Sequence, residues 1–213
     1  MDKLELIEKL SEEGAAKPLP HPFKQSLIWI VGIIVFMGAV ISIEGFRFDI
    51  NEKIQSLPFI LEIILLLATG ISALTISIYD SRPAGLPSNK LRAIPFILIV
   101  IWFYAAYSES MYMLNMENFI QSVKSDGYMC TCHILLVTVL PLFILFYFIR
   151  MGASVHQGWT GGMATLGVCS FTYLFMRFVE ANDDIVHLLV WHALPIVIFC
   201  LISIKVSKKF LHW

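Results

Sequence analysis

The sequence predicts an all-α integral membrane protein with six transmembrane helices, both termini in the cytoplasm and a short N-terminal amphipathic helix. Hydrophobic residues make up 58% of the 213 residues and charged residues 15%, whereas soluble domains have about 45–50% and about 25%. The apolar residues are gathered into long runs, and the mean hydropathy is +0.77. These observations exclude a soluble globular protein and a disordered chain. The net charge of −1 leaves no overall positive field that would attract nucleic acid.

The N-terminal residues 1–25 are predicted to form a unit of their own in front of the membrane domain at 26–213. Leu4, Ile7 and Leu10 recur every three residues and charged residues take the other faces, which predicts a short amphipathic helix. An extended spacer should follow, because it holds three closely spaced prolines: Pro18, Pro20 and Pro22.

A helix of about 12 residues is marginal alone in water, so its apolar face needs a partner. Two interpretations remain open for this helix. It lies on the membrane or on the cytoplasmic loops, or it is bound in the groove of a cytoplasmic protein. Acidic residues flank the apolar face, which disfavours anchoring to anionic lipid.

Six segments are apolar and long enough to cross a bilayer core of about 30 Å, which needs about 20 helical residues. Of the charged residue types, the second contains only Glu62, the third only Glu109 and the fifth only Arg177, and the other three contain none. Helices are predicted because the backbone must satisfy its own hydrogen bonds in lipid. The predicted spans are Leu27–Ile43, Leu57–Tyr79, Ile94–Met113, Met129–Ile149, Thr160–Val179 and Ile185–Ile204.

The distribution of Lys and Arg predicts the orientation of the spans. With a cytoplasmic N-terminus, eleven of the fifteen basic residues lie inside and four outside. The four outside are Arg47, Lys53, Lys124 and Arg177. An even number of spans then places the C-terminus inside as well.

Unusual polar residues gather at the predicted outer side of the membrane. Ionisable groups at membrane depth usually pair or line a cavity, so Arg177 is expected to pair with Glu62 or Glu109 across helices, or with Glu180 locally. Such pairs either fix helix packing or belong to a sensing site. The predicted ion-pair cluster comprises Glu62, Glu109, Arg177, Glu180, Asp183 and Asp184.

Cys130, Cys132 and His133 form the sharpest local pattern, at the start of the fourth span. Thiols on an oxidising side can be oxidised, and Cys, His and carboxylate together suit zinc or copper. Redox or metal sensing is therefore the hypothesis for these three residues, and small fillers at a helix start are the alternative. C-x-C-H is not a recognised four-ligand spacing, so no particular metal is predicted. His192, inside the last span, is interpreted as a packing residue.

The sequence predicts neither an enzyme nor a cofactor. It contains no Walker motif, G-x-G-x-x-G, H-E-x-x-H or nucleophile elbow. A repeat of three spans, found in many transporters, is also not recognisable. A small transporter or a metal-handling membrane protein remains the alternative function.

The C-terminal half carries a family resemblance. Cys130, Pro141 and the run 150–153 resemble a "C…P…R-R-G-A" pattern, and a glycine-rich helix ending at Arg177 follows. The remaining similarities are the acidic turn Asp183-Asp184, the pair Trp191-His192, and Leu211-His212-Trp213, which is similar to "L-R-W". Together with the six spans, these features resemble the NrsF-like family of bacterial inner-membrane negative regulators of extracytoplasmic-function sigma factors. The resemblance covers nearly the whole chain and is strongest over Met129–Trp213.

This resemblance implies that the N-terminal segment, with Leu4, Ile7 and Leu10, holds a sigma factor at the inner membrane and away from RNA polymerase. The implied partners are the sigma factor and membrane lipid, without direct contact to nucleic acid. An oxidative or heavy-metal signal would release the sigma factor through periplasmic cysteines. Some family members carry a second cysteine in the last outer loop, where this chain has Glu180. Either Cys130 and Cys132 replace that scheme or the signal differs.

Overall fold

The computed structural model of the chain describes residues 20–82, 88–113, 127–152 and 154–211, without the side chains of 109–113. Within these ranges the chain is helical and contains no strand. Six of the described helices are long and apolar enough to cross a membrane, which confirms that part of the predicted fold. They are α2 (Pro22–Glu44), α4 (Leu57–Asp80), α5 (Asn89–Met113), α7 (Tyr128–Arg150), α8 (Gln157–Val179) and the stretch Ile185–Phe210.

The last of these helices is continuous but changes its hydrogen-bonding register. It consists of α9 (Ile185–His187), a π-helical segment η2 (Leu188–Ala193) and α10 (Leu194–Phe210). A short helix not expected from the sequence, α3 (Ile50–Lys53), lies between α2 and α4. Pro22 belongs to the first turn of α2 and not to an extended spacer, because the fixed φ of proline suits the first helical position.

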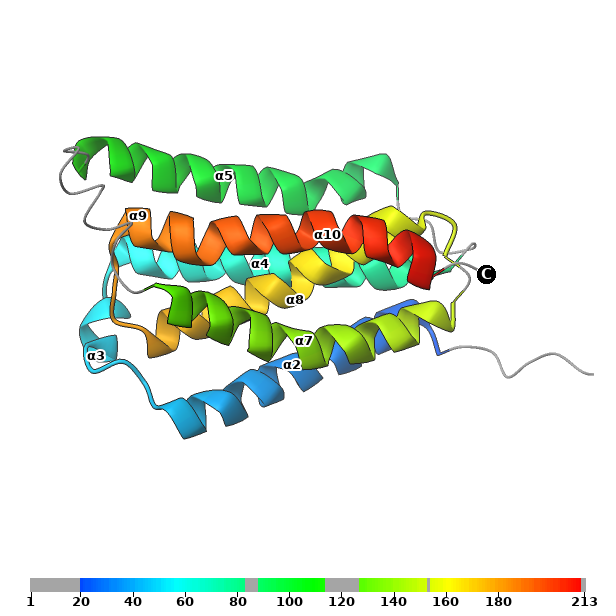
Figure 1. The fold of residues 1–213 in the computed structure, drawn as a ribbon, viewed down its shortest axis with the longest axis horizontal. Helices are drawn as coiled ribbons and strands as arrows, with labels where there is room; N and C mark the ends of the chain where they lie inside the picture. The colour runs from blue at the N-terminus through cyan, green and yellow to red at the C-terminus, as the bar shows by residue number, and fades with distance from the viewer. Residues whose placement is uncertain (1–19, 83–87, 114–126, 153, 212–213) are drawn as a thin grey trace, which may run out of the picture.

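Helix α8 lies at the centre of the bundle and packs against α4, α10, α7 and α2 (Figure 1). Its hydropathy is the lowest of the six helices, yet it is the most buried. Helices α2 and α5 lie at the periphery, with most of their surface free for lipid. The central position of α8 brings the residues at its C-terminal end close to four other helices.

Small residues allow α8 to approach its neighbours closely. A Cβ atom added to Gly161 would overlap the side chain of Ser207 on α10, and one added to Gly167 would lie 2.8 Å from the backbone nitrogen of Leu74 on α4. Thr165 Oγ1 donates a hydrogen bond of 2.5 Å to Ser203 Oγ across the α8–α10 contact. Because glycine has no side chain, α8 and its neighbours approach closely at these positions, and the helices are held together by close packing more than by the burial of large apolar side chains.

Replacing Gly161 by alanine is expected to lower the free energy of unfolding by about 1–3 kcal/mol, because α10 must move to admit the added methyl group. The matched control is Gly38→Ala in α2, where nothing lies within 4 Å of an added Cβ atom. Unfolding in detergent, followed by tryptophan fluorescence, compares the two variants. Equal stabilities would contradict the close α8–α10 contact.

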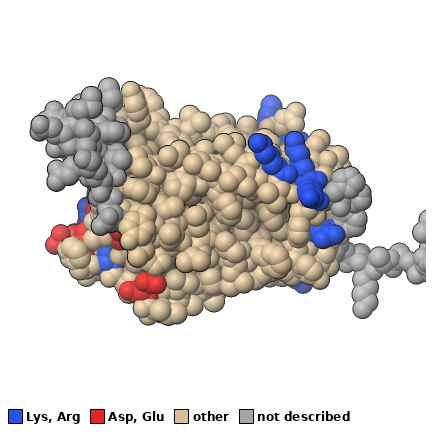
Figure 2. Space-filling view, viewed as in Figure 1, with Lys and Arg blue, Asp and Glu red and all other residues tan. Residues whose placement is uncertain are grey.

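The two ends of the bundle differ in charge. The first residues of α2 and the last residues of α10 lie at one end, here called the α10 end, and α3 and α9 lie at the other, here called the α3 end (Figure 1). On the face in view, Figure 2 shows Lys and Arg at the α10 end, Asp and Glu together with some Lys and Arg at the α3 end, and an uncharged surface between them. This arrangement matches the surface of a bundle that spans a bilayer.

Candidate functional site

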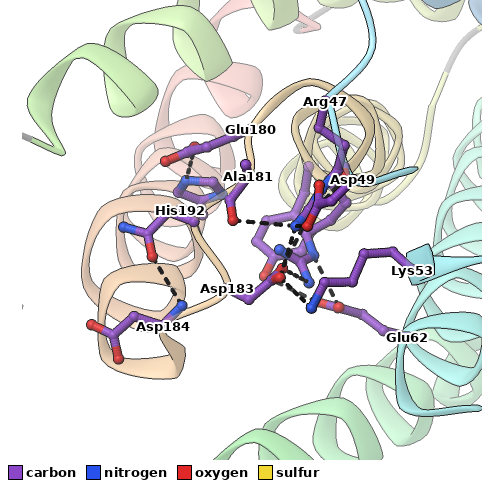
Figure 3. A network of polar contacts seen from close by, with 12 residues as sticks. Arg47, Asp49, Lys53, Glu62, Glu180, Ala181, Asp183, Asp184 and His192 are labelled. Carbon is purple, nitrogen blue, oxygen red and sulfur yellow. Dashed lines mark hydrogen bonds and ion pairs between the residues drawn. The ribbon is translucent and has the colours of Figure 1, made fainter. Parts of the chain in front are cut away.

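An ion-pair network joins the loops of the α3 end (Figure 3). Arg177, at the end of α8, lies between Glu62 of α4, with Nε 3.0 Å from Oε2, and Asp183, with Nη2 2.9 Å from Oδ1. Asp183 also lies 2.7 Å from Arg47 Nη2 and 2.6 Å from Lys53 Nζ. We call this set, with three cations and three anions, the ion-pair network: Arg47, Asp49, Lys53, Glu62, Arg177 and Asp183.

Arg47 ties the segment after α2 to the end of α8. Its side chain is completely buried, and its Nε lies 2.6 Å from Asp49 Oδ1. Its backbone nitrogen donates to the carbonyl oxygen of Phe178 at 2.9 Å, and its Nη2 donates to the carbonyl oxygen of Ala181 at 3.2 Å. A cation is favourable there because the last carbonyls of a helix carry partial negative charge. The network therefore connects the segment after α2 with α3, α4, the end of α8 and the loop before α9.

The network also keeps its loop groups ionised. Burial alone would raise the pKa of Asp183, but hydrogen bonds from Arg47 and Lys53 and the charge of Arg177 outweigh it and hold that pKa well below its usual range. The hydrogen bond with Asp49 raises the pKa of Arg47 above its ordinary value, against the effect of burial. Arg47 and Asp183 are thus both charged near neutral pH.

A second group, the Cys–Glu–His cluster, consists of Cys130, Glu180, His187 and His192. One potential metal-ligating atom from each residue lies within 4.8 Å of the other three. His187 Nε2 is 3.0 Å from Glu180 Oε1, and His192 Nε2 is 3.0 Å from Glu180 Oε2. Both histidines are buried, whereas Cys130 and Glu180 are partly exposed. The cluster therefore has a buried part, formed by the two histidines, and a part that reaches the surface of the protein, formed by Cys130 and Glu180.

Glu180 is the centre of this cluster. Burial would raise its pKa, but contacts with the side chains of His187, His192 and Cys130 outweigh burial and hold that pKa well below its usual range. Glu180 follows the last residue of α8, and its backbone nitrogen donates to the carbonyl oxygen of Met176 at 2.8 Å. The end of α8 thus presents a carboxylate to α7 and to the last helix.

The π-helical segment η2 brings the two histidines together. His187 and His192 are five residues apart, which in an α-helix would turn their side chains about 140° away from each other. A π-helix places residues i and i+5 in adjacent positions because its hydrogen bonds have that spacing. The two rings accordingly lie 5.4 Å apart.

The start of α7 packs directly onto this segment. Thr131 Oγ1 donates to the carbonyl oxygen of Trp191 at 2.6 Å, and only glycine fits at position 127 because a Cβ atom would overlap the Trp191 ring. Both contacts flank Cys130 and fix it beside η2. Irregular backbone within a helix is often found at functional sites.

Tyr173 of α8 links the two groups. Its ring lies 5.4 Å from that of His192, and its hydroxyl group lies 3.2 Å from Glu62 Oε1, to which it donates. The short loop 180–184 forms a second link, because it supplies Glu180 to the cluster and Asp183 to the network (Figure 3). A displacement of this loop would therefore affect both groups.

The structure separates the residues of the predicted sensing trio. Cys130 lies in the cluster, but Cys132 and His133 are exposed on the outer surface of α7. Positions two residues apart in an α-helix differ by about 200° around its axis. The helical period therefore already predicts that Cys130 and Cys132 lie on opposite faces of α7. His192, which the sequence analysis interpreted as a packing residue, is buried and also lies in the cluster.

The residues of the predicted ion-pair cluster also make different contacts in the structure. Glu62 and Asp183 contact Arg177, whereas Glu180 contacts the histidines instead. Asp184 accepts a hydrogen bond from the backbone nitrogen of Val186 at 3.3 Å and caps α9. Glu109 and the N-terminal candidates lie outside the described side chains; the latter are Leu4, Ile7 and Leu10.

Sequence reasoning missed the roles of Arg47, Asp49 and Lys53. A signal for them existed, because Arg47 and Lys53 are two of the few basic residues on the predicted outer side. Cations that violate the usual bias in membrane proteins need a local reason, and here each has a carboxylate partner.

The comparisons with known proteins agree with the sequence resemblance. A family model described as NrsF, negative regulator of sigma F, matches residues 11–213, nearly the whole chain. No curated protein matches the chain, and no solved structure matches it.

Proposed function

Because this chain belongs to the NrsF family of negative regulators of sigma F, we propose that it is a membrane-bound anti-sigma factor. In this proposal it holds an extracytoplasmic-function sigma factor at the bacterial inner membrane and releases it on a periplasmic oxidative or heavy-metal signal. The observation that carries the proposal is the family match over residues 11–213. The six apolar helices support a location in a membrane.

The sigma factor is proposed to bind the N-terminal segment. Leu4, Ile7 and Leu10 share one face at helical spacing, and a helix that is unstable alone gains its stability from a groove on its partner. The segment precedes α2, which begins at the α10 end of the bundle (Figure 1). A bound sigma factor would therefore lie at the end where Lys and Arg gather.

This arrangement requires the α10 end to face the cytoplasm. Fusion of alkaline phosphatase after Lys124 is expected to give activity, and fusion after Trp213 is expected to give none, because the positive-inside rule places the basic end in the cytoplasm. A green fluorescent protein fusion after Trp213 should fluoresce and serves as the complementary control. Phosphatase activity at Trp213 would overturn the proposed orientation.

A signal at the α3 end has a physical route to the N-terminal segment. The loop 180–184 joins the Cys–Glu–His cluster to Asp183, and Asp183 contacts Arg47 just after α2. Helix α2 is peripheral and makes few buried contacts, so a change at Arg47 can shift it with little repacking. A bias of a few kcal/mol between two arrangements is enough to change partner occupancy.

Co-expression with the candidate sigma factor tests the function. The sigma factor is expected in the membrane fraction with the full chain and in the soluble fraction with a chain that lacks residues 1–13. Both forms of the chain should be found in the membrane, since the deletion precedes the spanning helices. Equal recovery of the sigma factor in the membrane with both forms, or with neither, would contradict the proposal.

A further inference from the structure

We propose that Cys130, Glu180, His187 and His192 form a binding site for one divalent cation of the zinc class. This inference deepens the proposed function, because it names the chemical class of the signal at the α3 end. It stands on the placement of four donor groups from three elements: α7, the end of α8 and the last helix. The binding test below uses no sigma factor, so its failure is distinguishable from a failure of the anti-sigma role.

The set of donors selects the class of metal. One thiolate, one carboxylate and two imidazoles are ligands of zinc and similar borderline ions, whereas calcium and magnesium prefer oxygen ligands alone. When the cation binds, the Cys130 thiol releases its proton to solvent. The resulting thiolate and the Glu180 carboxylate carry two negative charges and the neutral imidazoles carry none, so a divalent cation gives a neutral complex. Neutrality matters here because the cluster lies at the end of membrane-spanning helices, where a net buried charge is costly.

The distances require only small side-chain adjustments. In a tetrahedral zinc site the donor atoms lie about 3.3–3.6 Å from one another, given zinc–nitrogen bonds of about 2.0–2.1 Å and zinc–sulfur bonds of about 2.3 Å. The four donor atoms here lie within 4.8 Å of one another, and the two nearest histidine–carboxylate pairs are at 3.0 Å. Binding would draw Cys130 and the carboxylate around one centre without moving the helices.

His192 gives an independent indication of a ligand. Its side chain is completely buried, yet neither ring nitrogen has an aligned hydrogen bond within the described part of the chain. Its Nε2 lies 3.0 Å from Glu180 Oε2, but the two atoms converge without the alignment of a hydrogen bond. A buried imidazole in this state is costly, and coordination to a cation would satisfy its Nε2 lone pair.

The backbone around the cluster is built to hold it. Segment η2 puts both histidines on one side of the helix, and the Thr131–Trp191 hydrogen bond fixes α7 against it. Access to the cluster is from the α3 end of the bundle, where Cys130 and Glu180 are the partly exposed members. A bound cation would tie the start of α7 to loop 180–184 and would thereby act on the ion-pair network through Asp183.

Cobalt(II) is the probe for the test, because its thiolate complexes have a charge-transfer absorption and its tetrahedral complexes have strong visible bands. The full chain is purified in detergent under reducing conditions, stripped of metal and titrated. We expect one equivalent of cobalt to bind with both absorptions, and zinc to displace it. Folding of each variant is checked by circular dichroism.

Matched variants identify the ligands. Cys130→Ser is expected to abolish the charge-transfer absorption, and His187→Ala and His192→Ala are each expected to weaken binding by about tenfold or more. Cys132→Ser and His133→Ala, on the same helix but outside the cluster, should leave the titration unchanged. The proposal is overturned if the folded wild-type chain forms no thiolate–cobalt complex at one equivalent, or if Cys132→Ser removes the absorption while Cys130→Ser retains it.

Discussion

Replacing Leu4 and Ile7 together by aspartate is expected to weaken sigma-factor binding by about a thousandfold. Each buried Leu or Ile side chain contributes about 1.5–3 kcal/mol, so two lose about 3–6 kcal/mol, and each 1.4 kcal/mol is a factor of ten in affinity. The segment also pays an ordering cost on binding, which leaves little affinity to spare. Titration of the purified full-length chain with labelled sigma factor measures the change.

A matched control variant introduces two aspartates on the opposite face of the predicted helix. Lys9→Asp with Glu12→Asp introduces two aspartates and changes the net charge by −2, as Leu4→Asp with Ile7→Asp does. Lys9 and Glu12 lie away from the apolar face of the predicted helix, so this variant should bind within a few-fold of the wild-type chain. If both double variants lose binding equally, charge and not the apolar face determines recognition.

Replacing Arg177 by methionine is expected to lower the free energy of unfolding by about 3–5 kcal/mol, the usual effect of breaking a buried ion pair. The side chain of Arg177 is only 6% exposed and contacts both Glu62 and Asp183. Its removal leaves two carboxylates close together without the cation between them. Unfolding in detergent by added denaturing surfactant, followed by tryptophan fluorescence, measures the loss.

Lys53 supplies the matched control within the same network. Its side chain is 34% exposed and contacts Asp183, so Lys53→Met should cost less than about 1 kcal/mol, as for other exposed pairs. Glu62→Gln combined with Arg177→Met is expected to recover part of the loss, because the uncompensated charge is removed. Equal losses for Lys53→Met and Arg177→Met would show that burial does not govern this network.

The sequence alone determined the six helices and the segregation of charge. Both follow from the bilayer, because about 20 apolar residues and a self-satisfied backbone are needed for each span regardless of how the spans pack. The predicted fifth span, Thr160–Val179, differs from α8 by only three residues at its start. The gathering of polar residues at one end was also readable, since each span begins or ends there.

The choice of partners among those polar residues came from the tertiary structure. From the sequence, Arg177 has three equally possible partners, because the positions of Glu62, Glu109 and Glu180 along the membrane normal are similar. Packing of α4 against α8 brings Glu62 to Arg177, whereas Glu180, just past the end of α8, lies beside the last helix. Two side chains at the same depth in the membrane meet only if the rotation of each helix about its own axis turns them toward each other. The sequence does not determine that rotation.

The Cys–Glu–His cluster depends on a local departure from the α-helical period. A sequence reading with 3.6 residues per turn places His187 and His192 on different faces, and the π register of η2 brings them to one face. That register is held by the packing of α7, through Thr131 and position 127, against Trp191. The residue types were visible in the sequence, but the place where they meet depends on a π-helical segment and on packing between helices that are distant in the sequence.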